Sequence, residues 1–184
     1  MTSTTTPTTP TTDLRYPIGA AKFESDLSEQ RRNKLIDEIV ATPSRMRAAV
    51  KGLSAEQLAT PYRPGGWTVI QLAHHVPDSH MNAYIRFKLA LTEDCPAIKT
   101  YAEDRWAELA DSRNTPIETS LCILDCVHER WNHVLRAMTS EDFKRKLNHP
   151  DKGVIDLEAM LCLYAWHGNH HVAHITELRK RMGW

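Results

Sequence analysis

The sequence predicts an all-α protein, a four-helix bundle with a long crossover connection. Four long segments carry apolar residues at the three- and four-residue spacing of amphipathic helices, and no segment shows the alternation typical of a strand. Residues 92–115 connect the second and third helical segments, and this connection is long enough to run back along a bundle. A chain of 184 residues is expected to form one domain.

The N-terminal stretch differs in composition from the rest of the chain. It is rich in Thr and Pro and has almost no apolar side chains, so burial cannot offset the entropy lost on ordering. We therefore expect a disordered tail at residues 1–13 and a single helical domain at residues 14–184. An irregular lead-in is expected to pack Tyr16, Ile18 and Phe23 onto the body of the domain.

The first two helices are expected in the N-terminal half of the chain. The first runs from about Ser28 to Lys51, with apolar residues at helical spacing. The second follows a pair of glycines, where Thr68 and Gln71 form the Thr-x-x-Gln pattern of a capping box. Its apolar periodicity continues to about Leu91.

The other two helices are expected in the C-terminal half. The third runs from about Pro116, a residue that suits the first turn of a helix, to Met138. The fourth begins near Asp156, which can cap its N-terminus, and runs to about Met182, where Gly183 ends it.

Composition and charge exclude several classes of function. The net charge is zero, so no nucleic-acid partner is indicated. No apolar run is long enough to span a membrane, and the N-terminus lacks the residue order of a signal peptide, so a cytoplasmic protein is expected.

The cysteines show no CxxC spacing, so we expect them to be reduced and mostly buried. Cys122 and Cys126 lie one helical turn apart, and they fit small core residues better than metal ligands. The four cysteines are Cys95, Cys122, Cys126 and Cys162.

Seven of the ten histidines fall in two short windows that lie far apart in the sequence. Imidazole is the commonest protein ligand of divalent transition metals. Both windows lie on predicted helices, so a metal site joining the second and fourth helices is the leading interpretation. The seven residues are His74, His75, His80, His167, His170, His171 and His174.

A helical wheel of the fourth helix places His167 and His171 inside the apolar stripe that faces the core. His170 and His174 lie on the flank of that stripe. A lone histidine on an apolar face is usually a hydrogen-bonded core residue. Two neutral imidazoles buried one turn apart, however, need partners for their ring nitrogens, and one shared ion would supply them.

The wheel of the second helix favours His75 as a third ligand. His75 lies at the border of the apolar side, on a polar stripe that would suit the wall of a pocket. The other polar residues of this stripe are Thr68, Gln71, Ser79, Asn82 and Arg86. His74 points about 100° away from His75 and His80 about 140° away. The wheel alone leaves both of them open as ligands.

Three histidines would leave at least one coordination position open, as in catalytic zinc sites. The HExxH motif of zinc peptidases is absent, because Gly168 stands where its Glu would be, and no carboxylate near the second window is clearly placed to activate water. This favours chemistry such as thiolate binding over peptide hydrolysis. Side chains that could orient the ligands or hold a substrate are Gln71, Asp78, Asn82, His170 and His174.

The histidine windows, in their wider context, resemble the DinB/YfiT-like superfamily. The resemblance lies in YPIG, TPYRPGGW, GGWTVIQLAHHVPDSHMNAYIRFKLALTED and LYAWHGNHHVAHITELRKRMGW, and it covers about residues 14–184. Its most specific motifs are Trp67, the His eight residues later, and the H-x3-H of the last helix. The chain is most similar to the YfiT-type branch of metal-dependent hydrolases, which includes bacillithiol transferase.

This resemblance implies a four-helix bundle with a long crossover, one nickel or zinc ion per chain on three histidines, and a homodimer. The family's first ligand opens an H-[LIV]-x-D stretch, here residues 75–78, which makes His75 that ligand. The other two ligands correspond to His167 and His171. Pro77 departs from the helix former expected at its position and is expected to kink the helix.

Three functions remain open, and no catalytic acid or base is assigned. The favoured one is a metal-dependent S-transferase, in which a low-molecular-weight thiol of the bacillithiol type binds the metal as a thiolate and attacks a small electrophile. Asn82 and Arg86 are candidates for substrate or thiol contacts, although Arg86 fits a surface ion pair equally well. The second is hydrolysis of a small ester or amide by a metal-activated water, with His170, His174 or Asp78 accepting the proton. The third is a binding protein in which the metal only stiffens the bundle.

Overall fold

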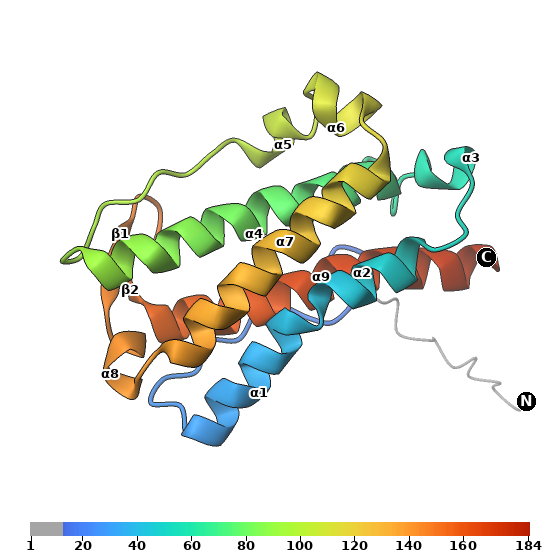
Figure 1. The fold of residues 1–184 in the computed structure, drawn as a ribbon. Coiled ribbons are helices and arrows are strands. Elements are labelled where there is room, and N and C mark those ends of the chain that lie inside the picture. Colours follow the sequence, from blue (N-terminus) through green and yellow to red (C-terminus); the bar gives the residue numbers. More distant parts are fainter. Residues whose placement is uncertain (1–12) are drawn as a thin grey trace, which may run out of the picture.

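Four long helical stretches lie side by side in the computed structural model, which describes residues 13–184 (Figure 1). They are α4 (Val69–Thr92), α7 (Ile117–Ala137), α9 (Leu157–Met182) and the consecutive pair α1 (Glu29–Val40) and α2 (Thr42–Val50). The predicted helical bundle is therefore confirmed. All but the last residue of the predicted N-terminal tail lies outside the described residues.

The first predicted helix is divided into two. Ser28 caps α1 by accepting a hydrogen bond from the backbone N–H of Arg31, and the helix ends before Ala41. Pro43 lies in the first turn of α2, where its missing N–H needs no partner. It disfavours a continuous helix through the residues before it, because it cannot donate to the preceding turn. The prediction of one helix from Ser28 to Lys51 is wrong at its centre.

The N-terminus of α4 has the predicted capping box. The Thr68 hydroxyl accepts a hydrogen bond from the backbone N–H of Gln71, and the side-chain oxygen of Gln71 accepts one from the backbone N–H of Thr68, at 3.3 and 3.0 Å. Pro77 lies inside α4 without ending it. The helix ends at Thr92, one residue beyond the predicted end.

The ends of α7 and α9 also follow from local sequence. Pro116 is the residue before α7 rather than its first helical residue. Asp156 caps α9 by accepting a hydrogen bond from the backbone N–H of Ala159 at 2.7 Å. Gly183 ends α9 with φ +71°, in the left-handed region that only glycine adopts without strain.

Helices α4 and α7 run in the same direction, so the chain between them returns along the outside of the bundle (Figure 1). This crossover carries the short helices α5 (Glu103–Trp106) and α6 (Ala110–Asn114). Two side chains of α4 fasten it. Gln71 donates to the carbonyl oxygen of Ala107 and Arg86 donates to that of Lys99, both at 2.9 Å.

Besides α5 and α6, four short elements were not predicted from the sequence. They are α3 (Ala55–Leu58), α8 (Ser140–Phe143) and the antiparallel strands β1 (Lys146–His149) and β2 (Gly153–Asp156), in which Lys146 pairs with Asp156. Strands of four residues are too short for alternation to be recognised in the sequence. The hairpin leads directly into α9 and therefore positions its first turn.

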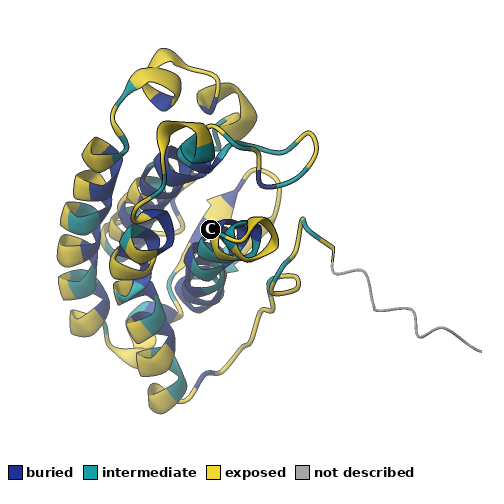
Figure 2. Ribbon diagram, turned by 90° about the vertical axis from the view of Figure 1, so that its right-hand side faces the viewer, coloured by how far each residue is buried: buried dark blue, intermediate teal, exposed yellow. Residues whose placement is uncertain are grey.

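The inward faces of the long helices are buried, whereas their outward faces are exposed (Figure 2). Within the described residues, no helix is long and apolar enough to cross a membrane.

The predicted burial of the lead-in and of most cysteines is wrong. Tyr16, Ile18 and Phe23 of the lead-in are 47%, 47% and 55% exposed, because the lead-in runs along the surface. Of the four cysteines only Cys162 is buried.

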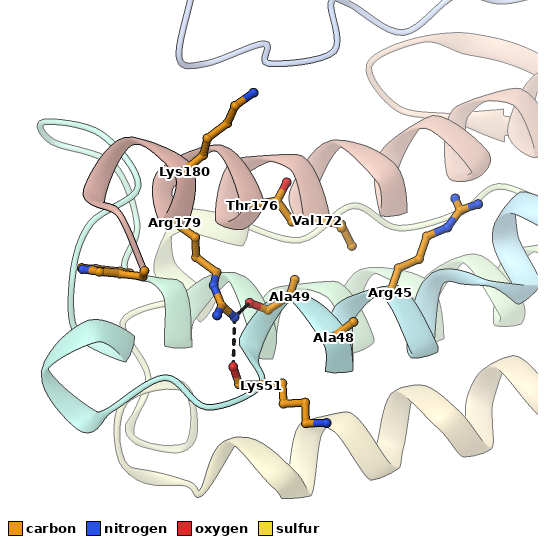
Figure 3. Close-up of a pocket in the computed structure, with 9 residues that line it drawn as sticks. Arg45, Ala48, Ala49, Lys51, Val172, Thr176, Arg179 and Lys180 are labelled. Carbon is orange, nitrogen blue, oxygen red and sulfur yellow. Dashed lines mark hydrogen bonds between the residues drawn. The ribbon is translucent and has the colours of Figure 1, made fainter.

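Helix α9 is also fastened to α2 at the C-terminal end of the bundle. Arg179 donates hydrogen bonds to the carbonyl oxygens of Ala49 and Lys51, at 2.8 and 3.0 Å, and so holds the end of α2 (Figure 3). A surface groove runs between the two helices at this point, and none of the residues that line it is a histidine. The groove is therefore separate from the histidine cluster.

Candidate metal centre

His75 on α4 and His167 and His171 on α9 come together between the two helices. One ring nitrogen from each lies within 4.8 Å of the corresponding nitrogens of the other two. The Nε2 atoms of His75 and His167 are 3.4 Å apart. The structure thus assembles the three residues that the sequence favoured as ligands.

These imidazoles are in the protonation state that binds metal. Burial lowers the pKa of His75 to about 4. Burial is also the main reason why the pKa values of His167 and His171 lie well below the usual value, and the neighbouring histidines add to the effect. All three rings are therefore neutral at pH 7, with lone pairs free to bind a cation.

The donor set fits a divalent transition metal. Zinc–nitrogen distances of about 2.0–2.1 Å with tetrahedral geometry place two ligand nitrogens about 3.4 Å apart. This matches the separation of the Nε2 atoms of His75 and His167. The Nδ1 atom of His171 is buried and has no hydrogen-bond partner among the described residues.

A chain of two further histidines holds His167 in this orientation. The Nε2 atom of His80 lies 3.1 Å from Nδ1 of His167, and Nδ1 of His80 lies 2.8 Å from Nε2 of His128 on α7. Because Nδ1 of His167 is occupied by His80, its Nε2 is left to face His75. Hydrogen bonding to the second nitrogen of a ligand histidine is the usual way to fix its ring and tautomer.

The wheel left His80 open as a ligand, and the structure places it behind the ligand His167 instead. Helix α4 is covered on different sides by α7 and α9, so a residue 140° from His75 still points into the bundle. His128 was not singled out, although it stands in the apolar stripe of α7, with Leu124 and Trp131 one turn away on either side. A single histidine within such an apolar stripe is the only feature of the sequence that points to a role for His128.

His74 faces α7 rather than the cluster. Its Nδ1 atom lies 2.6 Å from the hydroxyl oxygen of Ser120. Gly168, for its part, lies against α2: a Cβ atom at this position would be 2.5 Å from Oγ1 of Thr42. The place where zinc peptidases carry Glu is therefore a close contact between helices and not part of the site.

The cluster opens into a first cavity of about 360 Å³, which all three histidines line. His170 and His174 form part of its wall, as the sequence suggested. His170 stacks on Trp166 with ring centroids 4.2 Å apart, and His174 packs on Tyr62 at 4.0 Å. The Nε2 atom of His174 also lies 3.1 Å from the carbonyl oxygen of Arg15 in the lead-in.

A second cavity, of about 600 Å³, meets the cluster at His167. Ser79 lies beside this residue, with its hydroxyl oxygen 3.4 Å from Nε2 of His167. Arg86 lines the same cavity, so it is not the surface ion-pair residue that the sequence left open. His167 therefore lines both cavities, which adjoin each other and also share Glu103 and Asp104.

The remaining candidates have local roles. The amide of Gln71 is engaged by the helix cap and by the carbonyl oxygen of Ala107, so it is not available to a substrate. Asn82 donates to the backbone carbonyl oxygen of Asp78 within α4. Burial raises the pKa of the Asp78 carboxyl to about 6, and Asp78 lines neither of the two cavities.

The crossover brings two carboxylates to the site that the sequence did not associate with it. Glu103 and Asp104 line both cavities, together with His167. Desolvation raises the pKa of Glu103, and the nearby charge of Asp104 raises it further. From the sequence, no carboxylate near the second histidine window was clearly placed to activate water, and these two come from the crossover instead. No spacing in the sequence relates a loop residue to a helix that it covers in space.

Comparison with known proteins agrees with this geometry. A family model described as the DinB superfamily matches residues 38–175. A protein of Bacillus cereus, named "Putative metal-dependent hydrolase", is 53% identical over 172 residues, which cover 94% of this chain and 99% of that protein. A Bacillus anthracis protein with the same description is 52% identical over the same lengths.

Two solved structures share the fold. YfiT from Bacillus subtilis, described as a probable metal-dependent hydrolase with an unusual four-helix bundle topology, is 50% identical. It superposes with a TM-score of 0.90 and covers 93% of this chain and 98% of that one. The four-helix bundle protein TT2238 covers 77% of this chain with a TM-score of 0.56, and at 18% identity it supports the fold alone. This chain belongs to the DinB superfamily.

Proposed function

We propose that this protein is a metal-dependent enzyme that transfers a low-molecular-weight thiol to a small electrophile. His75, His167 and His171 hold one divalent transition metal, zinc or nickel. The observation that carries this proposal is that His167 lines two adjoining cavities. A site with three protein ligands beside two adjoining cavities suits a reaction that joins two small molecules.

A metal held by these three histidines would lower the pKa of a bound thiol and so supply a thiolate nucleophile at neutral pH. The sulfur forms a bond to an electrophilic carbon, the bond from that carbon to the leaving group breaks, and the leaving group departs with the electron pair. The thiol proton passes to solvent. His80 and His128 keep His167 oriented throughout.

The two cavities suit different reactants. Aromatic rings of Tyr62, Trp67 and Trp166 line the smaller one, and Trp67 packs on His75 with ring centroids 4.7 Å apart. These rings suit an electrophile with an apolar part. The larger cavity has Ser79 and Arg86 in its lining, and it suits the remainder of the thiol.

Hydrolysis of a small ester or amide is the second candidate. It is favoured by the position of Glu103 and Asp104 on both cavities and by the names of the relatives. Glu103 would be the group that accepts a proton from the water, and burial raises its pKa above the usual value. In this reaction Glu103 would take the role for which the sequence had suggested His170, His174 or Asp78.

The test is a conjugation assay with protein loaded in parallel with zinc or nickel. A fluorogenic electrophile is offered with bacillithiol, glutathione, mycothiol, cysteine or coenzyme A. We expect metal-dependent turnover with one thiol, abolished in His171→Ala and retained in His133→Ala, which removes an exposed histidine of α7. Turnover of esters or amides without any thiol conjugation would instead establish the hydrolase.

A further inference from the structure

Arg86 carries a buried positive charge that no carboxylate neutralises. The residue is 8% exposed and lines the larger cavity. Its Nη2 atom donates to the carbonyl oxygen of Lys99 at 2.9 Å, and Nη1 lies 3.4 Å from the hydroxyl oxygen of Tyr164. Among residues 13–184, no salt bridge includes Arg86.

Another arginine with little exposed surface has a counter-charge. Arg32, with 13% of its side chain exposed, is paired with Glu158 at 3.2 Å. Burying a cation without a counter-charge is costly, and Arg86 is more deeply buried than Arg32. Two neutral acceptors leave part of the five-donor guanidinium of Arg86 available to a ligand.

The surroundings of Arg86 do not supply the missing negative charge. His149 is close by, and burial, followed by the charge of Arg86, lowers its pKa, so it is neutral at pH 7. The other charged residues that line the cavity are exposed, three carboxylates and two cations, and none of the carboxylates forms a salt bridge with Arg86. They are Glu103, Asp104, Arg105, Asp151 and Lys152.

We infer that Arg86 is an anion-binding subsite that receives a carboxylate carried by the thiol co-substrate. The planar guanidinium can bind both oxygens of a carboxylate at once, which adds geometric selection to charge. This inference rests on the proposed transferase, because it assigns the thiol to the larger cavity. It narrows the co-substrate to thiols that carry an acidic group at a defined distance from sulfur.

The helix sets that distance. Ser79, which lies beside Nε2 of His167, and Arg86 are seven residues apart on α4, so two turns, or about 10 Å, separate their backbones. Tyr164 bridges the interval, since it contacts Arg86 and its ring centroid lies 5.7 Å from that of His167. A thiol whose carboxylate is several bonds from sulfur would span from the histidine cluster to Arg86.

The test compares two thiols that differ only at the end remote from sulfur. Binding of 6-mercaptohexanoate and of 6-mercaptohexanol to the zinc-loaded protein is measured by titration calorimetry. We expect the carboxylate to bind about tenfold more tightly to the wild type. In Arg86→Gln this preference disappears while the alcohol binds as before. Lys152→Gln, which removes an exposed cation of the same cavity, retains it.

Zinc affinity, measured in parallel, shows that each variant retains the metal centre. Arg86→Lys keeps the charge without the planar fork, and we expect a reduced preference. It serves as the test if the glutamine variant does not fold. Equal affinity of the two thiols for the wild type, or a preference that survives in Arg86→Gln, would overturn the subsite but leave the transferase standing. If neither thiol binds, the proposed function fails, and the subsite fails with it.

Discussion

The long helices carry two apolar clusters and, between these clusters, a group of buried histidines whose chemistry is polar. One cluster includes Phe87 and Trp131, and the other includes Leu72 and Ile175. Between them five histidines form what we call the histidine layer, and α4, α7 and α9 all contribute to it. The layer consists of His75, His80, His128, His167 and His171.

The apolar clusters and the histidine layer contribute differently to the stability of the fold. The apolar clusters stabilise the fold by removing hydrocarbon surface from water. The histidine layer buries polar rings that bond mainly to one another, and Nδ1 of His128 and Nδ1 of His171 have no hydrogen-bond partner among the described residues. The layer is therefore held in place by the clusters on either side and is preorganised for a metal.

The largest effect on stability is expected in an apolar cluster. Phe87 is fully buried, so Phe87→Ala should lower the free energy of unfolding by about 4 kcal/mol, through lost burial and the cavity left behind. Chemical denaturation measures this. Ile85→Ala, two residues away and half exposed, is the control and should change little. Equal losses in the two variants would contradict the assignment of this cluster as core.

The histidine layer should make the metal-free protein sensitive to acid. Burial lowers the pKa of His128 to about 4, whereas in the unfolded chain it stays near 6.5. Between these values the unfolded chain binds a proton that the folded chain does not, so stability falls as the pH falls from about 6.5 to about 4. The contribution of His128 is about 3 kcal/mol.

Urea denaturation at several pH values, in the presence of a chelator, measures this loss. His128→Leu should lose part of the pH dependence, because the residue that stays neutral in the fold is gone. A wild-type stability that is unchanged or rises on acidification through this window would show that the layer is not buried in its neutral form.

His80 connects the histidine layer to the metal centre, and we expect its loss to weaken metal binding. His80→Phe keeps an aromatic ring but removes the partner of Nδ1 of His167, so metal affinity should fall about 10–100-fold. His74→Phe is the matched control, because His74 bonds to Ser120 instead, and its affinity should stay near that of the wild type. Metal competition titrations compare the two variants. Wild-type affinity in His80→Phe would remove His80 from the support of the centre.

The same comparison explains what could be predicted from the sequence. Helix ends were predictable because their signals are local, as with Thr68 and Asp156, and so was the inward pair His167 and His171, because one helix face determines it. The break at Ala41 was missed, since the apolar periodicity continues across it.

Residues that depend on a third element were not predictable. His80 joins the layer because α7 and α9 cover different sides of α4, which a wheel of one helix does not represent. Glu103 and Asp104 reach the cavities because the crossover folds back over α4. In each case the position follows from packing between elements that are distant in sequence.

The central claim is that three histidines hold a metal whose remaining position is open to a thiol. X-ray absorption spectroscopy of the zinc-loaded protein tests it directly, before and after a thiol is added. We predict three imidazole ligands and one light atom at first, then a single sulfur at about 2.3 Å in place of that atom. A coordination shell closed by a fourth protein ligand, with no sulfur entering when thiol is added, would contradict the account and indicate a structural metal.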